Sequence, residues 1–321
     1  MADVFIATPL PQEALDLLSA AGIEYEMWDS QAPITAAEMS AKVMDSEVLV
    51  SAVNVQVPAS VIDAAPSLKL IANVGDGYSN IDLDAAKAHG VAVTNAPGRD
   101  SIASTAEQTV TSILALSRDL LAGDAMMKAN AFPGWEVTGY LGGHQVYGKK
   151  LLIIGLGRIG SLVAKMLHAF DMDIAYVDPV PASAELTAEL GLTRMDLDEG
   201  LAWADYVSLN CDLNADNHLM ISAPQLAMMQ PQAYLINCAR GPLVKESDLV
   251  AALKGGQIRG AALDTYEFEP KVSPELAALP NVVLTPHVGN ATVEARKEMA
   301  KTAVDNAVNQ LQGKPLQFQV Q

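Results

Sequence analysis

Short apolar runs alternate along the chain with longer segments whose apolar residues recur at helical spacing. A first series of runs occupies Val4–Ala7, Tyr25–Trp28, Val48–Val50, Leu70–Ala72 and Val91–Val93. A second series occupies Leu151–Ile154, Ile174–Val177, Tyr206–Leu209, Tyr234–Ile236, Ala261–Leu263 and Val282–Leu284. Strands that alternate with helices form βαβ units and parallel sheets. Two such series predict an α/β fold with two doubly wound parallel-sheet domains.

The segments outside these runs predict two long helices. A turn cluster at Asn95–Gly98 precedes the first, and Ser104 and Glu107 have the spacing of a capping box near its start. Its apolar face is supplied by Val110, Ile113, Leu114 and Leu121. The second helix extends from about Thr292 to Leu311, follows the final strand and could return to pack on the first domain.

Composition and charge narrow the class of protein. A chain of 321 residues, half of them hydrophobic, can bury two cores. Its 20 basic and 38 acidic residues give a net charge of -18, which disfavours nucleic acid and anionic membranes as partners. Two cysteines, Cys211 and Cys238, fit reduced thiols, and the first six residues lack the basic cluster of a signal peptide. We expect a cytoplasmic protein without a metal site.

A glycine motif follows the first strand of the second series. Leu151–Ile154 runs directly into Gly155-Leu156-Gly157-Arg158-Ile159-Gly160, and a helical pattern follows. In a dinucleotide site Gly155 permits the tight turn, Gly157 lets the pyrophosphate approach the backbone, and Gly160 allows close packing of helix and strand. The alternative is a glycine turn without a ligand, but the strand and helix on either side favour the dinucleotide site.

The next strand ends at Asp178, 18 residues past Gly160. A carboxylate at this position can accept hydrogen bonds from both ribose hydroxyls and repels a 2′-phosphate. No Arg or Lys occurs in the following residues 179–182. The sequence therefore predicts NAD rather than NADP as the cofactor.

Three reactive side chains follow strands of the same series. Arg240 follows a buried strand, where an unpaired guanidinium would be costly, so a substrate carboxylate or keto oxygen would explain it. The segment 261–270 supplies three carboxylates, and His287 follows the last strand. Taken singly, the arginine could form a structural salt bridge, the carboxylates could be solvated, and the histidine could be structural. Together they suit hydride transfer, with a His as general acid, a neighbouring Glu that raises its pKa, and an Arg that stabilises negative charge on oxygen.

The chain resembles the D-isomer-specific 2-hydroxyacid dehydrogenase family over nearly its whole length. The stretches that carry the resemblance are Asn73–Asp82, Thr94–Gly98, Ser104–Glu107, the glycine motif, Asn237–Gly241, Gly260–Pro270 and Pro286–Thr292. It implies Arg240 as the substrate clamp, His287 as the acid/base, and Glu269, the glutamate immediately before the proline, rather than Glu267 as the partner of His287.

The resemblance also implies the remaining site residues. Substrate contacts fall to Arg240, His287 and a backbone cradle for the substrate carboxylate at Val53, Asp76 and Gly77. Asp264 is expected to meet the nicotinamide carboxamide. The implied cofactor contacts are Thr105, Gly155, Gly157, Arg158, Ile159, Gly160, Asp178, Asn210, Cys211, Cys238, Ala239, Asp264, His287 and Gly289.

The family's architecture places a Rossmann cofactor domain, residues 100–289, within a flavodoxin-like substrate domain formed by 1–99 and 290–321. Family members are typically homodimers, and the irregular stretch of about 123–148, which contains Trp135, resembles their dimerisation arm. Trp135 could equally anchor a loop within its own subunit.

Two departures from the family pattern concern the ligand sites. Asp76 stands where the family has a small or apolar residue, and we expect its side chain to point away from the substrate. The stretch Asn210–Leu213 replaces the usual His-x-Pro-Leu at the cofactor.

The loop 51–57 has no positive charge, whereas members that act on 3-phosphoglycerate carry basic residues there. We therefore expect an unphosphorylated acid such as glyoxylate or hydroxypyruvate, with pyruvate-like acids next. The alternatives are a 3-phosphoglycerate dehydrogenase, a non-enzymatic NAD(H)-sensing protein as in the co-repressor branch of the family, and an enzyme of another dinucleotide fold.

Overall fold

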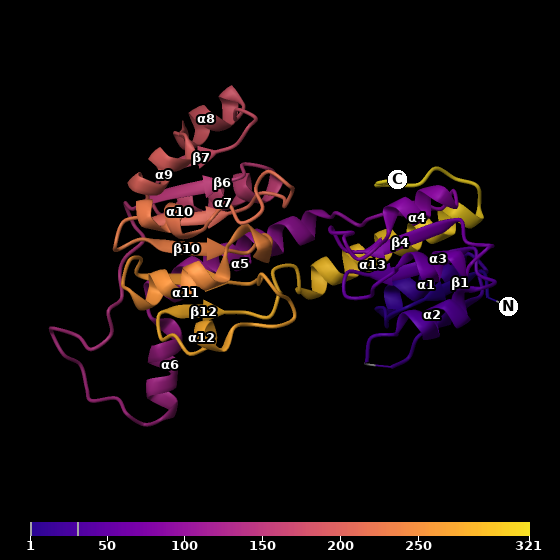
Figure 1. Cartoon of the computed structure of the whole chain (residues 1–321), viewed down its shortest axis with the longest axis horizontal. Helices are drawn as coiled ribbons and strands as arrows, with labels where there is room; N and C mark the ends of the chain where they lie inside the picture. The colour runs from indigo at the N-terminus through magenta and orange to yellow at the C-terminus, as the bar shows by residue number, and fades with distance from the viewer. Residues whose placement is uncertain (1, 31) are drawn as a thin grey trace. The chain divides into compact units, whose positions relative to one another are not determined.

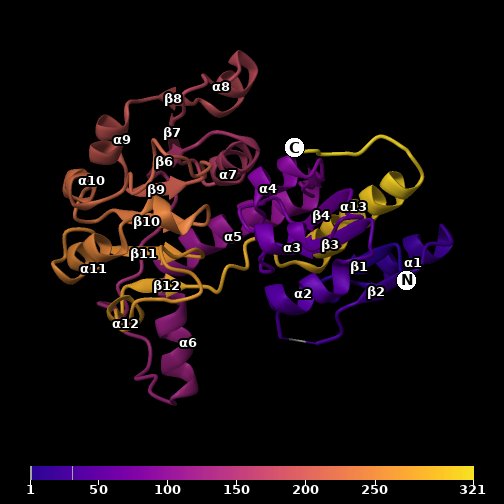
Figure 2. The same ribbon diagram turned by 45° about the vertical axis from the view of Figure 1, so that its right-hand side comes forward.

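A computed structural model describes residues 2–30 and 32–321 (Figure 1, and Figure 2 from a second direction). The chain forms two compact units. Unit 1 contains Met1–Ile102 and Asn290–Gln321, and unit 2 contains Ala103–Gly289. Every paired strand in both sheets is parallel, which confirms the predicted fold class. In the part of the chain that is described, no helix is both long and apolar enough to cross a membrane.

Unit 1 has a five-stranded sheet with the order β2-β1-β3-β4-β5. The strands are β1 (Val4–Ile6), β2 (Tyr25–Met27), β3 (Val48–Ala52), β4 (Leu70–Val74) and β5 (Ala92–Thr94). The helices that belong wholly to this unit are α1 (Gln12–Ala20), α2 (Ala36–Val43), α3 (Ala59–Asp63), α4 (Leu83–Ala88) and α13 (Val293–Leu311). This is the flavodoxin-like strand order.

Alternate residues of each strand in unit 1 pack on opposite faces of the sheet. Phe5 packs with α2, α3 and α4 on one face, and Val4 and Ile6 pack with α1 and α13 on the other. The last helix therefore lies against the first domain, as the sequence predicts, although it is separated from β1 by most of the chain. The Val320 amide donates to the Val93 carbonyl oxygen at 2.9 Å, and the Val93 amide donates to the Gln321 carbonyl oxygen at 3.2 Å, which ties the end of the chain to β5.

Unit 2 has a seven-stranded sheet with the order β12-β11-β10-β9-β6-β7-β8. The strands are β6 (Lys150–Ile154), β7 (Asp173–Val177), β8 (Thr193–Arg194), β9 (Tyr206–Leu209), β10 (Tyr234–Asn237), β11 (Gly260–Leu263) and β12 (Val282–Leu284). Numbered within the unit, this order is 3-2-1-4-5-6-7, an extended form of the Rossmann order. The strand order reverses between β6 and β9, and open α/β sheets bind ligands outside the carboxyl ends of strands at such a point.

Helices cover both faces of the second sheet. On one face Leu152 and Ile154 pack with α9 (Leu197–Trp203), α10 (Ala223–Met228), α11 (Glu246–Lys254) and α12 (Pro274–Ala277). On the other face Leu151 and Ile153 pack with α5 (Arg99–Ser117), α7 (Arg158–His168) and α8 (Ala184–Leu190). Burial on both faces explains why these strands are continuous apolar runs in the sequence.

The structure corrects the predicted start of α5. The helix begins at Arg99, so Ser104 and Glu107 lie inside it and do not form a capping box. The carboxylate of Glu298, on α13, accepts hydrogen bonds from the backbone N–H of Arg99 at 3.0 Å and of Asp100 at 2.8 Å. A distant side chain therefore satisfies the first amides of the helix, which a local motif would otherwise do.

The predicted irregular arm is also shorter than expected. Its first six residues, 123–128, belong to helix α6 (Leu120–Lys128), which buries none of its side chains and therefore shows no apolar periodicity. The loop that follows extends away from the sheet of unit 2 (Figure 1). Trp135 is 82% exposed there, so it does not anchor the loop within its own subunit.

Candidate active site

The glycine motif lies where the strand order of unit 2 reverses. Gly155 follows β6 with a φ of +92°, a backbone conformation that favours glycine. A Cβ on Gly155 would stand 2.6 Å from the backbone nitrogen of Cys211, just after β9, and a Cβ on Gly160 would stand 2.1 Å from the Gly155 carbonyl oxygen. Both positions are therefore limited to glycine by close backbone packing.

Gly157 differs from these two, because a Cβ there would meet nothing within 4 Å. It is the N-cap of α7, a helix of 11 residues, and it has no side chain to offer the first-turn amides, which include those of Arg158 and Ile159. Open space beside free amides at a helix N-terminus fits the pyrophosphate of a dinucleotide. Unit 2 thus satisfies the geometric requirement for the cofactor at this loop.

Asp178 follows β7 and turns back toward the same loop. Its Oδ2 accepts a hydrogen bond from the Leu156 amide, and its Oδ1 accepts one from the Val180 amide, both at 2.8 Å. The carboxylate is therefore held in one orientation beside the glycine motif. The structure also brings a cation to this strand end, since the guanidinium of Arg194 donates to the Asp178 carbonyl oxygen at 2.8 Å. Arg194 lies outside residues 179–182, so the residues that follow Asp178 in sequence do not indicate it.

His287 and Glu269 form a hydrogen-bonded pair in unit 2. His287 Nδ1 lies 2.9 Å from Glu269 Oε2, and the Tyr266 amide donates to Glu269 Oε1 at 2.9 Å. The side chains of His287 and Glu269 are 47% and 35% exposed. Glu267 lies apart from His287, and its Oε2 accepts from the Glu246 amide at 2.7 Å.

The contact between His287 and Glu269 shifts the pKa of both side chains. The hydrogen bond that His287 donates to Glu269 raises the pKa of His287, and it outweighs burial, which acts in the opposite direction. Burial alone would raise the pKa of Glu269, but the hydrogen bonds from His287 and Tyr266 lower it. The charge of Arg240 lowers the pKa of Glu269 and of His287 alike, so it acts on both. The arrangement favours a carboxylate beside a protonated imidazole.

Asp264 fixes the loop that carries His287. Its carboxylate is buried, and it accepts hydrogen bonds from Thr285 Oγ1 at 2.5 Å and from the amides of Val288 at 2.9 Å and Gly289 at 2.7 Å. His287 itself has a φ of +52°, which costs a non-glycine residue on the order of 1–3 kcal/mol. Anchoring on both sides by Asp264 holds this strained conformation. The family resemblance implies only a cofactor contact for Asp264, and this role in the loop was not predicted.

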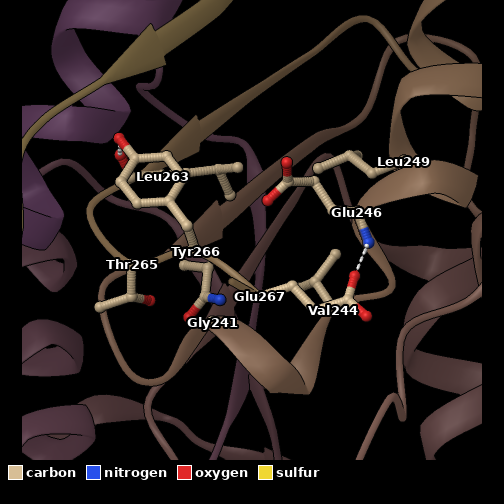
Figure 3. A pocket seen from close by; sticks show the side chains of 9 residues that line it. Gly241, Val244, Glu246, Leu249, Leu263, Thr265, Tyr266 and Glu267 are labelled. Atoms are coloured by element: carbon tan, nitrogen blue, oxygen red, sulfur yellow. Dashed lines mark hydrogen bonds between the residues drawn. The ribbon is translucent and has the colours of Figure 1, made fainter. Parts of the chain in front are cut away.

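Arg240 and Glu269 lie on two loops that pack closely together. A Cβ on Gly241 would stand 1.8 Å from the carbonyl oxygen of Tyr266, so only glycine fits between them. Figure 3 shows Gly241 and Tyr266 side by side on the wall of a cavity of about 10 Å³. The side chain of Arg240 is exposed, and its Nη1 donates to the Ala239 carbonyl oxygen at 2.8 Å. Arg240 therefore needs no ligand to offset burial of its guanidinium, contrary to the prediction.

Several other predicted residues lie at the strand ends of unit 2. Asn210 and Cys211 follow β9, and burial raises the pKa of the Cys211 thiol to about 11. Cys238 and Ala239 follow β10, and burial raises the pKa of Cys238 to about 12. Thr105 lies on α5, within 3.5 Å of the position that a Cβ on Gly289 would take. No group of three metal-ligating side chains was found among the residues described.

The predicted carboxylate cradle belongs to unit 1. Val53 packs on Gly75, where a Cβ would stand 2.5 Å from Val53 Cγ1. The Gly77 carbonyl oxygen accepts from Asn73 Nδ2 at 2.7 Å. The Asp76 carboxylate accepts from Ser101 Oγ at 2.5 Å, so its side chain is directed to the first turn of α5.

Comparisons with known proteins agree with the predicted family. Residues 110–289 match the model of the D-isomer specific 2-hydroxyacid dehydrogenase NAD-binding domain. A protein of Staphylococcus haemolyticus assigned as a 2-hydroxyacid dehydrogenase is 43% identical over 99% of both chains.

Solved structures give the same result. One from Thermus thermophilus is 35% identical, with a TM-score of 0.92 over 99% of both chains. A glyoxylate reductase from Paecilomyes thermophila is 29% identical, with a TM-score of 0.85 over 99% of this chain and 97% of its own. The chain therefore belongs to the D-isomer specific 2-hydroxyacid dehydrogenase family.

Proposed function

We propose that the chain reduces a small unphosphorylated 2-keto acid to its D-2-hydroxy acid with NADH, and that glyoxylate or hydroxypyruvate is the preferred substrate. The His287–Glu269 pair, with the charge of Arg240 acting on both, carries the proposal. A proton donor, a carboxylate that keeps it protonated and a cation for the substrate are what ketone reduction requires of the protein.

Each of the three side chains has a defined part in this reaction. Arg240 binds the substrate carboxylate and stabilises negative charge on the keto oxygen. NADH, when bound, supplies the hydride to the carbonyl carbon. His287 then gives its Nε2 proton to the oxygen, because its Nδ1 is engaged by Glu269. Glu269 stabilises the imidazolium before transfer and fixes the ring.

Two features support the choice of cofactor and acid. The Asp178 carboxylate, fixed beside the glycine motif, repels a 2′-phosphate and favours NAD over NADP. The loop 51–57 has no cation to bind a phosphate on the substrate. The relative from Paecilomyes thermophila, named a glyoxylate reductase, is consistent with a small acid.

The proposal is tested by following NADH oxidation at 340 nm with glyoxylate, hydroxypyruvate, pyruvate, larger 2-keto acids and 3-phosphohydroxypyruvate. The proposal expects the highest kcat/KM with glyoxylate or hydroxypyruvate. Turnover restricted to the phosphorylated acid would instead identify a 3-phosphoglycerate dehydrogenase. NADH binding without turnover of any acid would favour an NAD(H)-sensing protein.

We also propose that the chain forms a homodimer through α6 and the loop that follows it. This arm exposes many large apolar side chains, namely Leu120, Leu121, Met127, Phe132, Trp135, Val137, Tyr140, Leu141 and Tyr147. So large an apolar surface is typical of an interface. Light scattering should find that the wild type is a dimer and that the double variant Trp135→Glu with Val137→Asp is a monomer. The control variant Val293→Asp, at an exposed site outside the arm, should remain a dimer. A monomeric wild type would refute the proposal.

We also propose a cytoplasmic location, which the free thiols of Cys211 and Cys238 fit.

A further inference from the structure

An arginine on the edge strand of unit 2 lies against the end of the neighbouring strand. β8 pairs with β7 in parallel, and Arg194 stands opposite Tyr176. The guanidinium of Arg194 reaches past the end of β7, where Nη2 donates to the carbonyl oxygens of Asp178 at 2.8 Å and of Pro179 at 3.0 Å. Nε also donates to the Asp178 oxygen, at 3.2 Å. Three hydrogen bonds therefore hold an exposed cation beside Asp178.

The same strand end borders an open depression of about 510 Å³. Asp178 and Arg194 both line it, together with the exposed Asp196 and Glu199. The Asp178 carboxylate is directed to the glycine motif by the Leu156 amide. Arg194 is thus a positive charge next to the carboxylate proposed to meet the ribose, within a lining whose other charged side chains are acidic.

We propose that Arg194 is a specificity residue for the dinucleotide, and that it forms a 2′-phosphate site whose use Asp178 prevents. This inference rests on the proposed binding of the adenosine ribose at Asp178. In the wild type the carboxylate repels a 2′-phosphate, and Arg194 serves to hold the end of β7. Without the Asp178 charge, the guanidinium is a donor within reach of the phosphate oxygens, and arginine is well suited to that contact.

The acidic neighbours limit the size of the effect. Asp196 and Glu199 remain after the Asp178 charge is removed, so a 2′-phosphate still meets negative charge. Both are exposed and therefore screened by solvent and salt. We expect the dissociation constant for NADPH to fall by about tenfold in Asp178→Ala, which is near the lower end for a hydrogen bond to a charged group.

The experiment measures the dissociation constants of NADH and NADPH by isothermal titration calorimetry without a keto acid. Four proteins are compared at one salt concentration. They are the wild type, Asp178→Ala, and two double variants that combine Asp178→Ala with either Arg194→Ala or Lys165→Ala. Lys165 is an exposed cation of the same unit, paired with Glu189 at 3.3 Å, so its removal controls for the loss of one positive charge. The gain in NADPH affinity should survive the Lys165 change and disappear with the Arg194 change.

Two results would overturn the inference: a gain that survives Arg194→Ala, or no gain in Asp178→Ala. Asp178→Asn keeps an oxygen acceptor for the Val180 amide and replaces Asp178→Ala if that variant does not fold. A wild type that prefers NADPH would refute the proposed NAD preference, but the comparison of the two double variants would still decide the role of Arg194.

Discussion

The sharpest test of the cofactor site is the substitution Gly157→Ala. The backbone at Gly157 has a φ of -72° and a ψ of -158°, which alanine can adopt, and a Cβ would meet nothing within 4 Å. The added methyl group therefore fits the protein itself. It would occupy the space beside the first amides of α7 that the proposed pyrophosphate needs.

The expected effects on stability and on binding differ in size. Alanine is a poorer N-cap than glycine, which lowers the free energy of unfolding by about 0.5 kcal/mol. Alanine also reduces the conformational entropy of the unfolded chain, which raises the free energy of unfolding by about 0.4–1 kcal/mol, so the two effects nearly cancel. A hydrogen bond to a charged group contributes roughly 1.5–3 kcal/mol, and about 1.4 kcal/mol is a factor of ten in affinity. Loss of one amide contact to the phosphates should raise the dissociation constant for NADH by roughly ten- to a hundredfold.

Calorimetric titration with NADH and thermal unfolding without cofactor measure the two effects separately. Gly160→Ala is the contrasting variant, because its Cβ would stand 2.1 Å from the Gly155 carbonyl oxygen and must displace the backbone. It should lower the free energy of unfolding by about 1–3 kcal/mol or more. A Gly157→Ala protein that binds NADH as tightly as the wild type would refute the placement of the pyrophosphate.

Three further substitutions test the trio and the fold. His287→Ala should lower kcat for keto-acid reduction by roughly two to four orders of magnitude with little change in melting temperature, and near-normal turnover would exclude it as the general acid. Glu269→Gln removes the carboxylate that raises the pKa of His287. The loss of reduction activity with rising pH should therefore begin at a lower pH than in the wild type. An unchanged pH profile would contradict this coupling. Glu298→Ala removes the acceptor for the first amides of α5 and should lower the free energy of unfolding by about 0.5–2 kcal/mol, measured by denaturant titration. An unchanged free energy of unfolding would show that solvent satisfies those amides equally well.

Most strands could be predicted from the sequence because the fold buries them on both faces. Leu151–Ile154 alternates between the two cores of unit 2 and therefore leaves a continuous apolar run. β8 was missed because it has only two residues, Thr193 and Arg194, and both are exposed. Two exposed polar residues give no hydrophobic signal, although this strand extends the sheet beyond β7.

Residues that act through the backbone of another segment were harder to predict. Tyr266 orients Glu269 through its amide, and the Asp264 carboxylate holds the amides that follow His287. In each case the sequence indicates the reactive side chain, Glu269 or His287, but not the group that positions it. An amide donor is present at every residue except proline, so its use leaves no mark on the sequence.

Contacts between distant segments depend on strand order, which local patterns do not contain. Glu298 caps α5 from 198 residues away, and the nearby Ser104–Glu107 pattern, which has the right spacing, is not used. Arg194 lies 16 residues beyond Asp178, yet parallel pairing of β8 with β7 brings its guanidinium to the Asp178 carbonyl oxygen. The cation beside Asp178 therefore comes from the neighbouring strand of the sheet, because the residues next in sequence lead away from the strand end.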